Sequence, residues 1–418
     1  MPDQPLQGPS SATHVSTVVT SNAPGVTSLP PDVKHGYDEI VKGITASSNA
    51  AKKRKRTQYQ SMSAFERLIS TSKHFPRGVH PFFDIGLVMM HGTESQWGPP
   101  PDANSPALSK EAIGAFDKLF AVAPELLLVV KQFYIEIMDK AEQWEQLTIT
   151  MREAATSTRT TDTNGIKHKL SYFLPNPLKQ ALSPPVPEQE LKSDCGLAQP
   201  ILRYYIVGYK DRLKLPSLRY TPAPDVEQEQ EGGSSSDDQR AAERLLQKIV
   251  AGKYQLKYKP YPSFLYKDSK FDPNNLDAGL LHSDTVLRFL RHIWLGPSAA
   301  LSGAEKISKT CNTSLHNVKK VTPARICYAV VQARTTLGTS EWTPRDGKYS
   351  FKRLFNSILK LFTAEPEHPW VIDVLEWYQS QMFQNVDFDS DAEQDKDSDD
   401  EDDVLAQRRR RAAAAIGS

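Results

Sequence analysis

The strongest constraint on the fold is a series of four amphipathic segments in the last third of the sequence, within residues 286–383. Each segment carries apolar side chains three and four positions apart, the spacing that places them on one face of a helix. The Gly296-Pro297 pair ends the first segment, Pro323 and Pro369 stand at the first turns of two others, and Ser350 opens the remaining one. These signals predict four helices around one buried core.

The rest of the sequence predicts a mainly α protein: an irregular helical bundle with long proline-rich loops and disordered termini. Further helical segments are expected near residues 63–68, 109–120 and 241–250. Residues 156–200 lose the helical period and collect prolines, so we expect mostly loops there, with a short helix near 166–173. Residues 201–207 have a β-like composition, with helix as an open alternative.

Composition divides the chain into three parts. Residues 1–57 are rich in Ser, Thr, Pro, Ala and Gly and are predicted to be a disordered arm, because they have too few large apolar side chains to bury. Residues 58–385 are the predicted globular body, which includes a flexible insert at 221–240 and the four-helix core at 286–383. Residues 386–418 are predicted to be a disordered tail, first acidic and then basic.

A long seam of apolar or small residues lies within residues 127–151. Its members are Leu127, Val130, Tyr134, Ile137, Ala141, Trp144 and Met151. A seam of this length packs either inside a bundle or against a second copy of itself. The pattern therefore leaves a homo-oligomer through residues 127–151 open beside packing within one chain.

Charge is separated into blocks, although the formal net charge is only +1. Residues 286–360 hold thirteen Lys or Arg and three acidic residues, whereas residues 387–403 hold eleven acidic residues and one lysine. The first block predicts a phosphate-binding surface on the basic residues that lie off the apolar stripes. These are Arg288, Arg291, Lys319, Lys320, Arg325 and Arg334.

The alternative for this block is an ordinary charged solvent face. We hypothesise that the acidic residues 387–403 fold back over the basic face and compete with nucleic acid. A solubilising tail or a binder of basic proteins would have the same composition. Ser390 and Ser398 precede acidic residues and suit an acid-directed kinase, whose phosphates would add negative charge.

A compact basic cluster predicts a nuclear protein that is carried by an import receptor. The cluster consists of Lys52, Lys53, Arg54, Lys55 and Arg56, and Arg408–Arg411 form a second candidate signal. A solvated charge run or a nonspecific nucleic-acid contact is the alternative. Cys195, Cys311 and Cys327 lie far apart, which fits reduced thiols inside a cell. We expect no membrane partner, because no apolar run of eighteen residues and no secretory signal pattern is present.

An enzyme would depend on a turn-rich loop that could gather carboxylates around a metal, as in nucleases. Its acidic and histidine residues are Asp268, Asp272, Asp277, His282 and Asp284. Asp beside Asn, Pro and Gly is also common in turns, and the spacing fixes no coordination geometry. We therefore predict no catalytic residue, cofactor or metal, and a non-catalytic protein that contacts nucleic acid or chromatin proteins. The alternatives are a metal-dependent nuclease-like enzyme of mobile-element origin and a self-associating scaffold.

Several segments resemble a known protein family. They are PSFLY at 262–266, FDPNN and GLLHSD within 271–284, RHIWLGPSAA at 291–300, VTPARICYAVVQAR at 321–334, and the closing PW and LEWY, with looser likeness around Thr161-Asp162 and SPPVPEQELKSD. They are similar to an uncharacterised domain family of unknown function that is expanded in mushroom-forming fungi, and the likeness covers roughly residues 110–385. The resemblance implies no activity, cofactor or catalytic residue.

Overall fold

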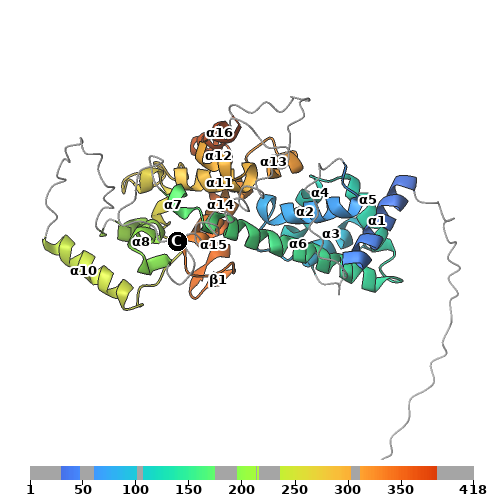
Figure 1. Cartoon of the computed structure of the whole chain (residues 1–418), viewed down its shortest axis with the longest axis horizontal. Helices are drawn as coiled ribbons and strands as arrows, with labels where there is room; N and C mark the ends of the chain where they lie inside the picture. Colours follow the sequence, from blue (N-terminus) through green and yellow to red (C-terminus); the bar gives the residue numbers. More distant parts are fainter. Residues whose placement is uncertain are drawn as a thin grey trace, which may run out of the picture.

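The computed structural model describes residues 30–47, 61–100, 107–174, 195–212, 214–215, 236–302 and 311–383. Helices dominate these residues, and the only named strands among them are the two-residue β1 (Arg345–Asp346) and β2 (Tyr349–Ser350), which pair as an antiparallel hairpin. The predicted mainly α fold is confirmed (Figure 1). None of the helices in the described ranges is long and apolar enough to cross a bilayer.

The N-terminal half of the described chain is a group of helices around one apolar cluster. These helices are α1 (Pro31–Ser47), α2 (Ala64–Gly78), α3 (Ile85–Trp97), α4 (Lys110–Phe120), α5 (Glu125–Ile135) and the first half of α6 (Ala141–Lys167). Ser63 begins α2 in a reciprocal capping box with Glu66, and Asp84 and Ser109 cap α3 and α4. The apolar faces of the helices meet at fully buried side chains such as Phe116.

The C-terminal half surrounds a second and larger apolar cluster. Its helices are α7 (Leu170–Phe173), α8 (Pro200–Ile206), α9 (Tyr209–Arg212), α11 (Asp284–Leu295), α12 (Pro297–Ser302), α13 (Asn312–Leu315), α14 (Pro323–Leu337), α15 (Phe351–Thr363) and α16 (Pro369–Phe383), with short 3₁₀ turns at η3 (Gly196–Ala198), η4 (Ser263–Leu265) and η5 (Lys267–Ser269). The four helices predicted within 286–383 are present as α11, α14, α15 and α16. Helix α14 is buried on every side from Ile326 to Leu337, because α2, α6, α8, α11 and α15 surround it.

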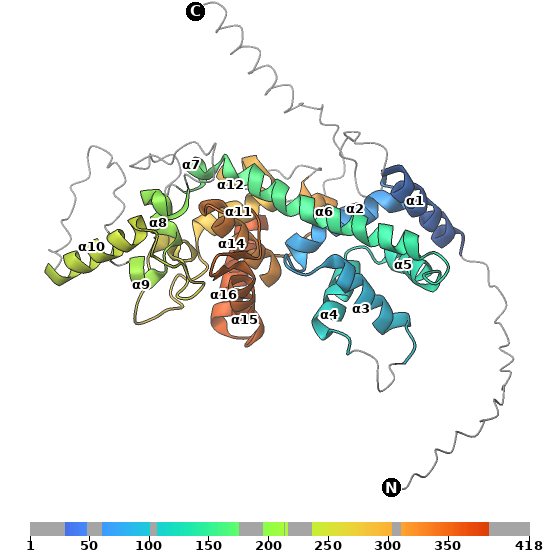
Figure 2. The ribbon, with the colours of Figure 1, turned by 90° about the horizontal axis from the view of Figure 1, so that it is seen from below.

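Helix α6 joins the two halves (Figures 1 and 2). Its Leu147 and Met151 belong to the N-terminal cluster, whereas its Ile166 belongs to the C-terminal one. At the far end from α1, α10 (Ser236–Val250) packs its Leu245 and Ile249 on a small third cluster (Figure 1). Helix α6 therefore contributes side chains to both apolar cores.

The prediction of disorder for the whole of residues 1–57 is wrong for residues 31–47, which form α1. Val33, Tyr37, Ile40 and Ile44 lie on one face of this helix and are buried against α2 and α5. The average composition of residues 1–57 is dominated by small and polar residues, so it gave no indication of this short apolar stripe. Packing on neighbouring helices stabilises a helix whose sequence alone does not.

The seam at 127–151 is not one continuous helix. Helix α5 ends at Ile135 and α6 begins at Ala141, because backbone hydrogen bonds at residues 136–140 close a turn between them. A break of five residues allows both helices to contribute to the same intramolecular core. A homo-oligomer through residues 127–151 stays a prediction, without the continuous coiled-coil geometry that first suggested it.

Three segments predicted as other structure are helical. Helix α6 continues through residues 156–167, where loops were expected, because buried Thr158, Thr163 and Ile166 face neighbouring helices. Residues 201–206, with their β-like composition, belong to α8, which Gln199 caps and Pro200 begins. The last five residues of the predicted flexible insert, 236–240, are the first turn of α10.

Two glycines inside helices give a matched test of the N-terminal packing. A Cβ atom at Gly92 of α3 would collide with the buried ring of Phe116, whereas nothing lies within 4 Å of a Cβ atom at Gly114 of α4. We expect Gly92→Ala to lower the free energy of unfolding by about 1–3 kcal/mol through overpacking. Gly114→Ala is expected to raise it by about 0.5–1 kcal/mol, because alanine favours helix. Urea unfolding measures both, and equal effects would contradict the close contact at Gly92.

Candidate anion-binding site

The six basic residues predicted to bind nucleic acid do not form one exposed surface. Arg334 is 0% exposed and lies 4.4 Å from the centre of the Tyr349 ring. Arg288 is 6% exposed, and its Nη1 donates a hydrogen bond of 2.7 Å to the carbonyl oxygen of Phe173. The prediction that these two residues lie on a free surface is wrong, because neighbouring helices cover both.

Arg291 and Arg325 are partly buried and engaged in contacts within the chain. Arg291 donates from Nε and Nη2 to the carbonyl oxygen of Gln381, at 3.2 and 2.6 Å, which ties α11 to α16. The guanidinium of Arg325 stacks 4.9 Å from the Trp294 ring centre, and burial lowers the pKa of Arg325 to about 10. Both arginines therefore serve packing.

Lys319 and Lys320 are the two exposed members of the predicted set, in the segment before α14. The other predicted functional residues lie outside the described residues. They are the basic cluster Lys52, Lys53, Arg54, Lys55 and Arg56, the serines Ser390 and Ser398, the acidic residues 387–403, and Arg408–Arg411.

The acidic loop before α11 is used for turns. Asp272 accepts a hydrogen bond of 2.8 Å from the backbone N–H of Asn274, and His282 instead lies 3.1 Å from Asp373 of α16. Within the described residues, no three His, Cys, Asp or Glu side chains are placed to hold a metal ion. The convergence of Asp272, Asp277 and Asp284 that would favour a nuclease-like enzyme is not found.

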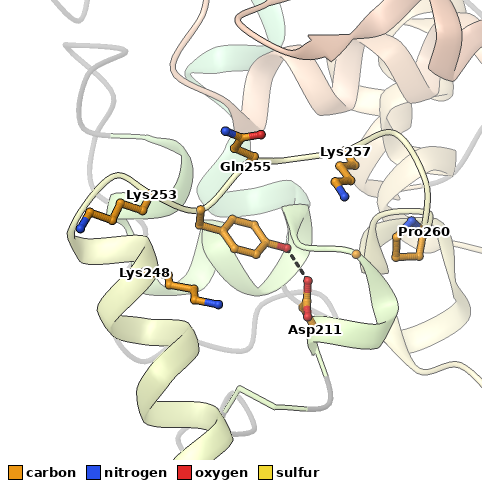
Figure 3. Close-up of a pocket in the computed structure, with 8 residues that line it drawn as sticks. Asp211, Lys248, Lys253, Gln255, Lys257 and Pro260 are labelled. Atoms are coloured by element: carbon orange, nitrogen blue, oxygen red, sulfur yellow. Dashed lines mark hydrogen bonds between the residues drawn. The ribbon is translucent and has the colours of Figure 1, made fainter.

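A cavity of about 360 Å³ with three lysines in its wall lies between the end of α10, the segment after it, and α9. It is lined by Gly208, Asp211, Lys248, Lys253, Tyr254, Gln255, Lys257 and Pro260 (Figure 3). We call it the lysine pocket. All three lysines are exposed to solvent, and none makes an ion pair with a carboxylate of the described residues.

The end of α10 positions these lysines. Gly252 adopts a φ of +66°, the left-handed conformation that commonly ends a helix. The backbone N–H groups of Lys253 and Tyr254 then both donate to the carbonyl oxygen of Lys248, at 2.8 and 3.0 Å. This reversal brings the backbone that follows α10 back toward Lys248 in the last turn of the helix.

The single carboxylate of the lysine pocket is already engaged. The Tyr254 hydroxyl donates a hydrogen bond of 2.8 Å to Asp211, and Lys214 pairs with the other carboxylate oxygen at 2.9 Å. Burial and the neighbouring Asp211 raise the pKa of Tyr254, so the phenol stays neutral. Figure 3 shows Lys248 and Lys257 reaching toward Asp211 from different segments. The pocket consequently has an excess of positive charge.

The sequence contained a signal for this site. Residues 244–259 hold five basic residues and no acidic one. This local excess of positive charge was not used in the prediction, which relied on the larger basic block at 286–360. The basic residues are Arg244, Lys248, Lys253, Lys257 and Lys259. Three of these five residues, Lys248, Lys253 and Lys257, line the lysine pocket.

Fold and site together define a mainly helical protein with an exposed, lysine-lined cavity. The chain belongs to a family of unknown function, DUF6698, whose model matches residues 153–383, more than half of its length. The predicted membership of an uncharacterised domain family is thereby confirmed. The match begins inside α6 and includes the lysine pocket, whereas α1 to α5 lie outside it. No curated protein and no solved structure matches this chain.

Proposed function

We propose that this chain is a non-catalytic nuclear protein that binds nucleic acid through the lysine pocket. The observation that carries the proposal is that Lys248, Lys253 and Lys257 line one cavity whose only carboxylate, Asp211, is already held by two partners. Lysine ammonium groups bind phosphate as point charges without a fixed geometry. The site therefore suits the sugar-phosphate backbone rather than a particular base sequence.

The surroundings of the pocket support a backbone contact. Exposed Lys210 and Lys259 lie in the chain next to its lining residues Asp211 and Pro260, and extend the positive charge beyond the cavity. The ring of Tyr204 is covered by the guanidinium of Arg212 at 3.3 Å, which leaves that face unable to stack on a base. Binding by phosphate contacts alone is nonspecific in sequence and depends strongly on salt.

In this proposal the basic cluster at Lys52–Arg56 directs the chain to the nucleus, and the acidic residues 387–403 compete with nucleic acid for exposed lysines. The predicted interaction of the acidic residues with a basic face is retained, but its target moves from the arginines of 286–360 to the lysine pocket. Charge competition of this kind weakens as salt rises.

The test is a binding titration of the full chain with duplex DNA and single-stranded RNA over a range of salt. Simultaneous replacement of Lys248, Lys253 and Lys257 by glutamine is expected to weaken binding by about tenfold to a hundredfold at low salt. The slope of log K against log salt for duplex DNA should become shallower by about 0.9 for each phosphate that the variant no longer neutralises. Removal of residues 387–418 should strengthen binding at low salt.

The matched control replaces Lys42, Lys110 and Lys118, three exposed lysines of α1 and α4, by glutamine. It changes the net charge equally but leaves the lysine pocket intact, so affinity should stay near that of the wild type. Equal reductions of affinity in the two triple variants would show that only total charge matters. Failure of the wild-type chain to bind either nucleic acid would contradict the proposed function itself.

A further inference from the structure

Arg334 indicates a second site, because its positive charge has no ion-pair partner within the described residues. Its side chain is 0% exposed, and none of its three guanidinium nitrogens has a hydrogen-bond acceptor among the described residues. Its neighbours are the rings of Tyr349 and Phe351, whose centres lie 4.4 and 5.7 Å from the guanidinium carbon. A buried cation without an acceptor is costly, so such a group in a folded protein calls for an anionic partner.

Tyr349 does not supply that partner. Burial raises the pKa of Tyr349 to about 12 and outweighs both the charge of Arg334 and its polar contact with the phenol, which favour the ionised form. The ring is therefore neutral near physiological pH. Stacking on two aromatic rings offsets part of the cost of burying Arg334, but it leaves the in-plane N–H groups of the guanidinium without acceptors.

Arg334 lines a cavity of about 170 Å³. The other lining residues are Cys195, Gly196, Leu197, Ala198, Ile206, Leu256, Gly338, Thr339 and Asp346. We call it the arginine cavity. Its wall is largely apolar, with the Arg334 cation and the partly exposed Asp346 as its charged groups.

The arginine cavity is lined by two glycines, Gly196 and Gly338, at positions where a side chain would occupy part of its space. A Cβ atom at Gly338 would lie 2.6 Å from Nη1 of Arg334, and a Cβ atom at Gly196 would lie 2.9 Å from the methyl carbon of Thr339. Gly196 also has a φ of +70°, which disfavours any other residue there. Larger residues at either position would press on the guanidinium or on the cavity wall. The absence of side chains is thus what gives Arg334 access to the cavity.

We propose that the arginine cavity binds a small monocarboxylate with an apolar remainder. A carboxylate accepts two parallel hydrogen bonds from the planar fork of an arginine, and the apolar walls suit a short hydrocarbon group. Asp346 disfavours a doubly charged anion such as a phosphate monoester, because like charges in one cavity repel. A water molecule takes roughly 30 Å³ in the liquid, so the cavity holds only a small compound.

The experiment compares the thermal unfolding of the full chain in acetate, propionate and butyrate with that in chloride at the same ionic strength. A carboxylate that binds only the folded state should raise the Tm saturably, by roughly 2–4 °C, and calorimetric titration should give the matching affinity. Arg334→Met is expected to abolish the shift. Asp346→Asn, at a partly exposed strand position, is expected to bind the carboxylate more tightly, by about threefold to tenfold.

Absence of a shift beyond chloride in the wild type would overturn the proposal, as would an equal shift in Arg334→Met. If Arg334→Met does not fold, the affinity of Asp346→Asn for the carboxylate tests the proposal instead: unchanged affinity in that variant contradicts the site.

Asp194 precedes Cys195 in the sequence and supplies a further control. A Tm lowered by Asp194→Asn, with no carboxylate response in the wild type, would assign the partner of Arg334 to the chain itself. Nucleic-acid binding through the lysine pocket should not respond to the carboxylates, which separates the two proposals.

Discussion

Replacing Asp162 by alanine is expected to lower the free energy of unfolding by about 3–5 kcal/mol, because it leaves Arg77 buried without its counter-charge. Arg77 and Asp162 are each 7% exposed and form a two-pronged ion pair with N–O distances of 2.6 and 2.8 Å. The pair links α2 to α6 at the place where α6 passes from one apolar cluster to the other. Its removal should therefore weaken the junction of the two halves.

A wider network holds Asp162 in place. The Tyr328 hydroxyl donates to Asp162 at 2.8 Å, and Gln332 donates to Tyr328 at 2.7 Å. Gln332 in turn accepts from Thr163 at 2.8 Å, so α14 joins the network through two residues. Every polar group in this series of hydrogen bonds has a partner, the condition under which a buried network stabilises a fold. Removal of the one carboxylate at its centre leaves three donor groups without their acceptor: Nε and Nη2 of Arg77 and the hydroxyl of Tyr328.

Urea unfolding measures the effect, with Glu125→Ala as the control. Glu125 lies 3.7 Å from Arg67 in a partly solvent-exposed pair, so its replacement should change stability by about 1 kcal/mol or less. The double variant Arg77→Met with Asp162→Ala should be less destabilised than the sum of the single variants, because no unpaired charge stays buried. Additive destabilisation would show that the ion pair does not act as a unit.

Stability is expected to fall steeply as the pH drops from about 6.5 toward 4, because of the buried His74 and His80 and the partly buried His292. Burial lowers the pKa of His80 and of His292 to about 4, and it lowers the pKa of His74 well below its usual value. The folded chain keeps these rings neutral while the unfolded chain takes up protons from about pH 6.5 downward. Each histidine therefore removes about 1.4 kcal/mol of stability per pH unit in that window, and the contribution is fully present above it.

The surroundings of His80 explain this preference for the neutral ring. The imidazole stacks on Phe83 with a centroid distance of 3.8 Å, accepts from the backbone N–H of Phe82, and lies where Lys352 disfavours a second positive charge. Its contact with Asn356 favours the charged ring but does not outweigh burial. The ring consequently behaves as part of the core.

Unfolding curves at several pH values test this expectation. His80→Gln should reduce the slope of stability against pH by about 1.4 kcal/mol per unit. Replacement of His168, which is exposed at the end of α6, by glutamine should leave the slope unchanged. A wild-type stability that is flat between about pH 6.5 and 4.5 would contradict the neutral state of the buried rings.

Local signals were enough to predict the four helices of the C-terminal core. Gly296 ends α11, Pro323 begins α14, and Ser350 caps α15 by accepting a hydrogen bond from the backbone N–H of Arg353. These residues act within one turn of the chain, so their effect is visible in sequence. Helix α1 was missed because its stability comes from contact with α2 and α5 rather than from caps or composition.

The candidate sites were less predictable than the helices. Arg334 lies on α14, whose apolar stripe is evident in the sequence. The other faces of α14 are covered by five helices, and the sequence of α14 does not predict that they pack there. Lys248 of α10 and Asp211 of α9 come from different helices and line one cavity. The reversal of the chain at Gly252 places Tyr254, which donates its hydroxyl hydrogen bond to Asp211. Spacing in sequence therefore identified basic residues but not which of them face solvent.

The sequence by itself determined a mainly helical chain, membership of an uncharacterised family, and a strong separation of positive and negative charge. Tertiary structure alone decided that Arg288 and Arg334 are buried while Lys248, Lys253 and Lys257 share an exposed cavity. The physical reason is that helix formation depends on neighbours within a turn, whereas the burial of a charge depends on segments that arrive from distant parts of the chain.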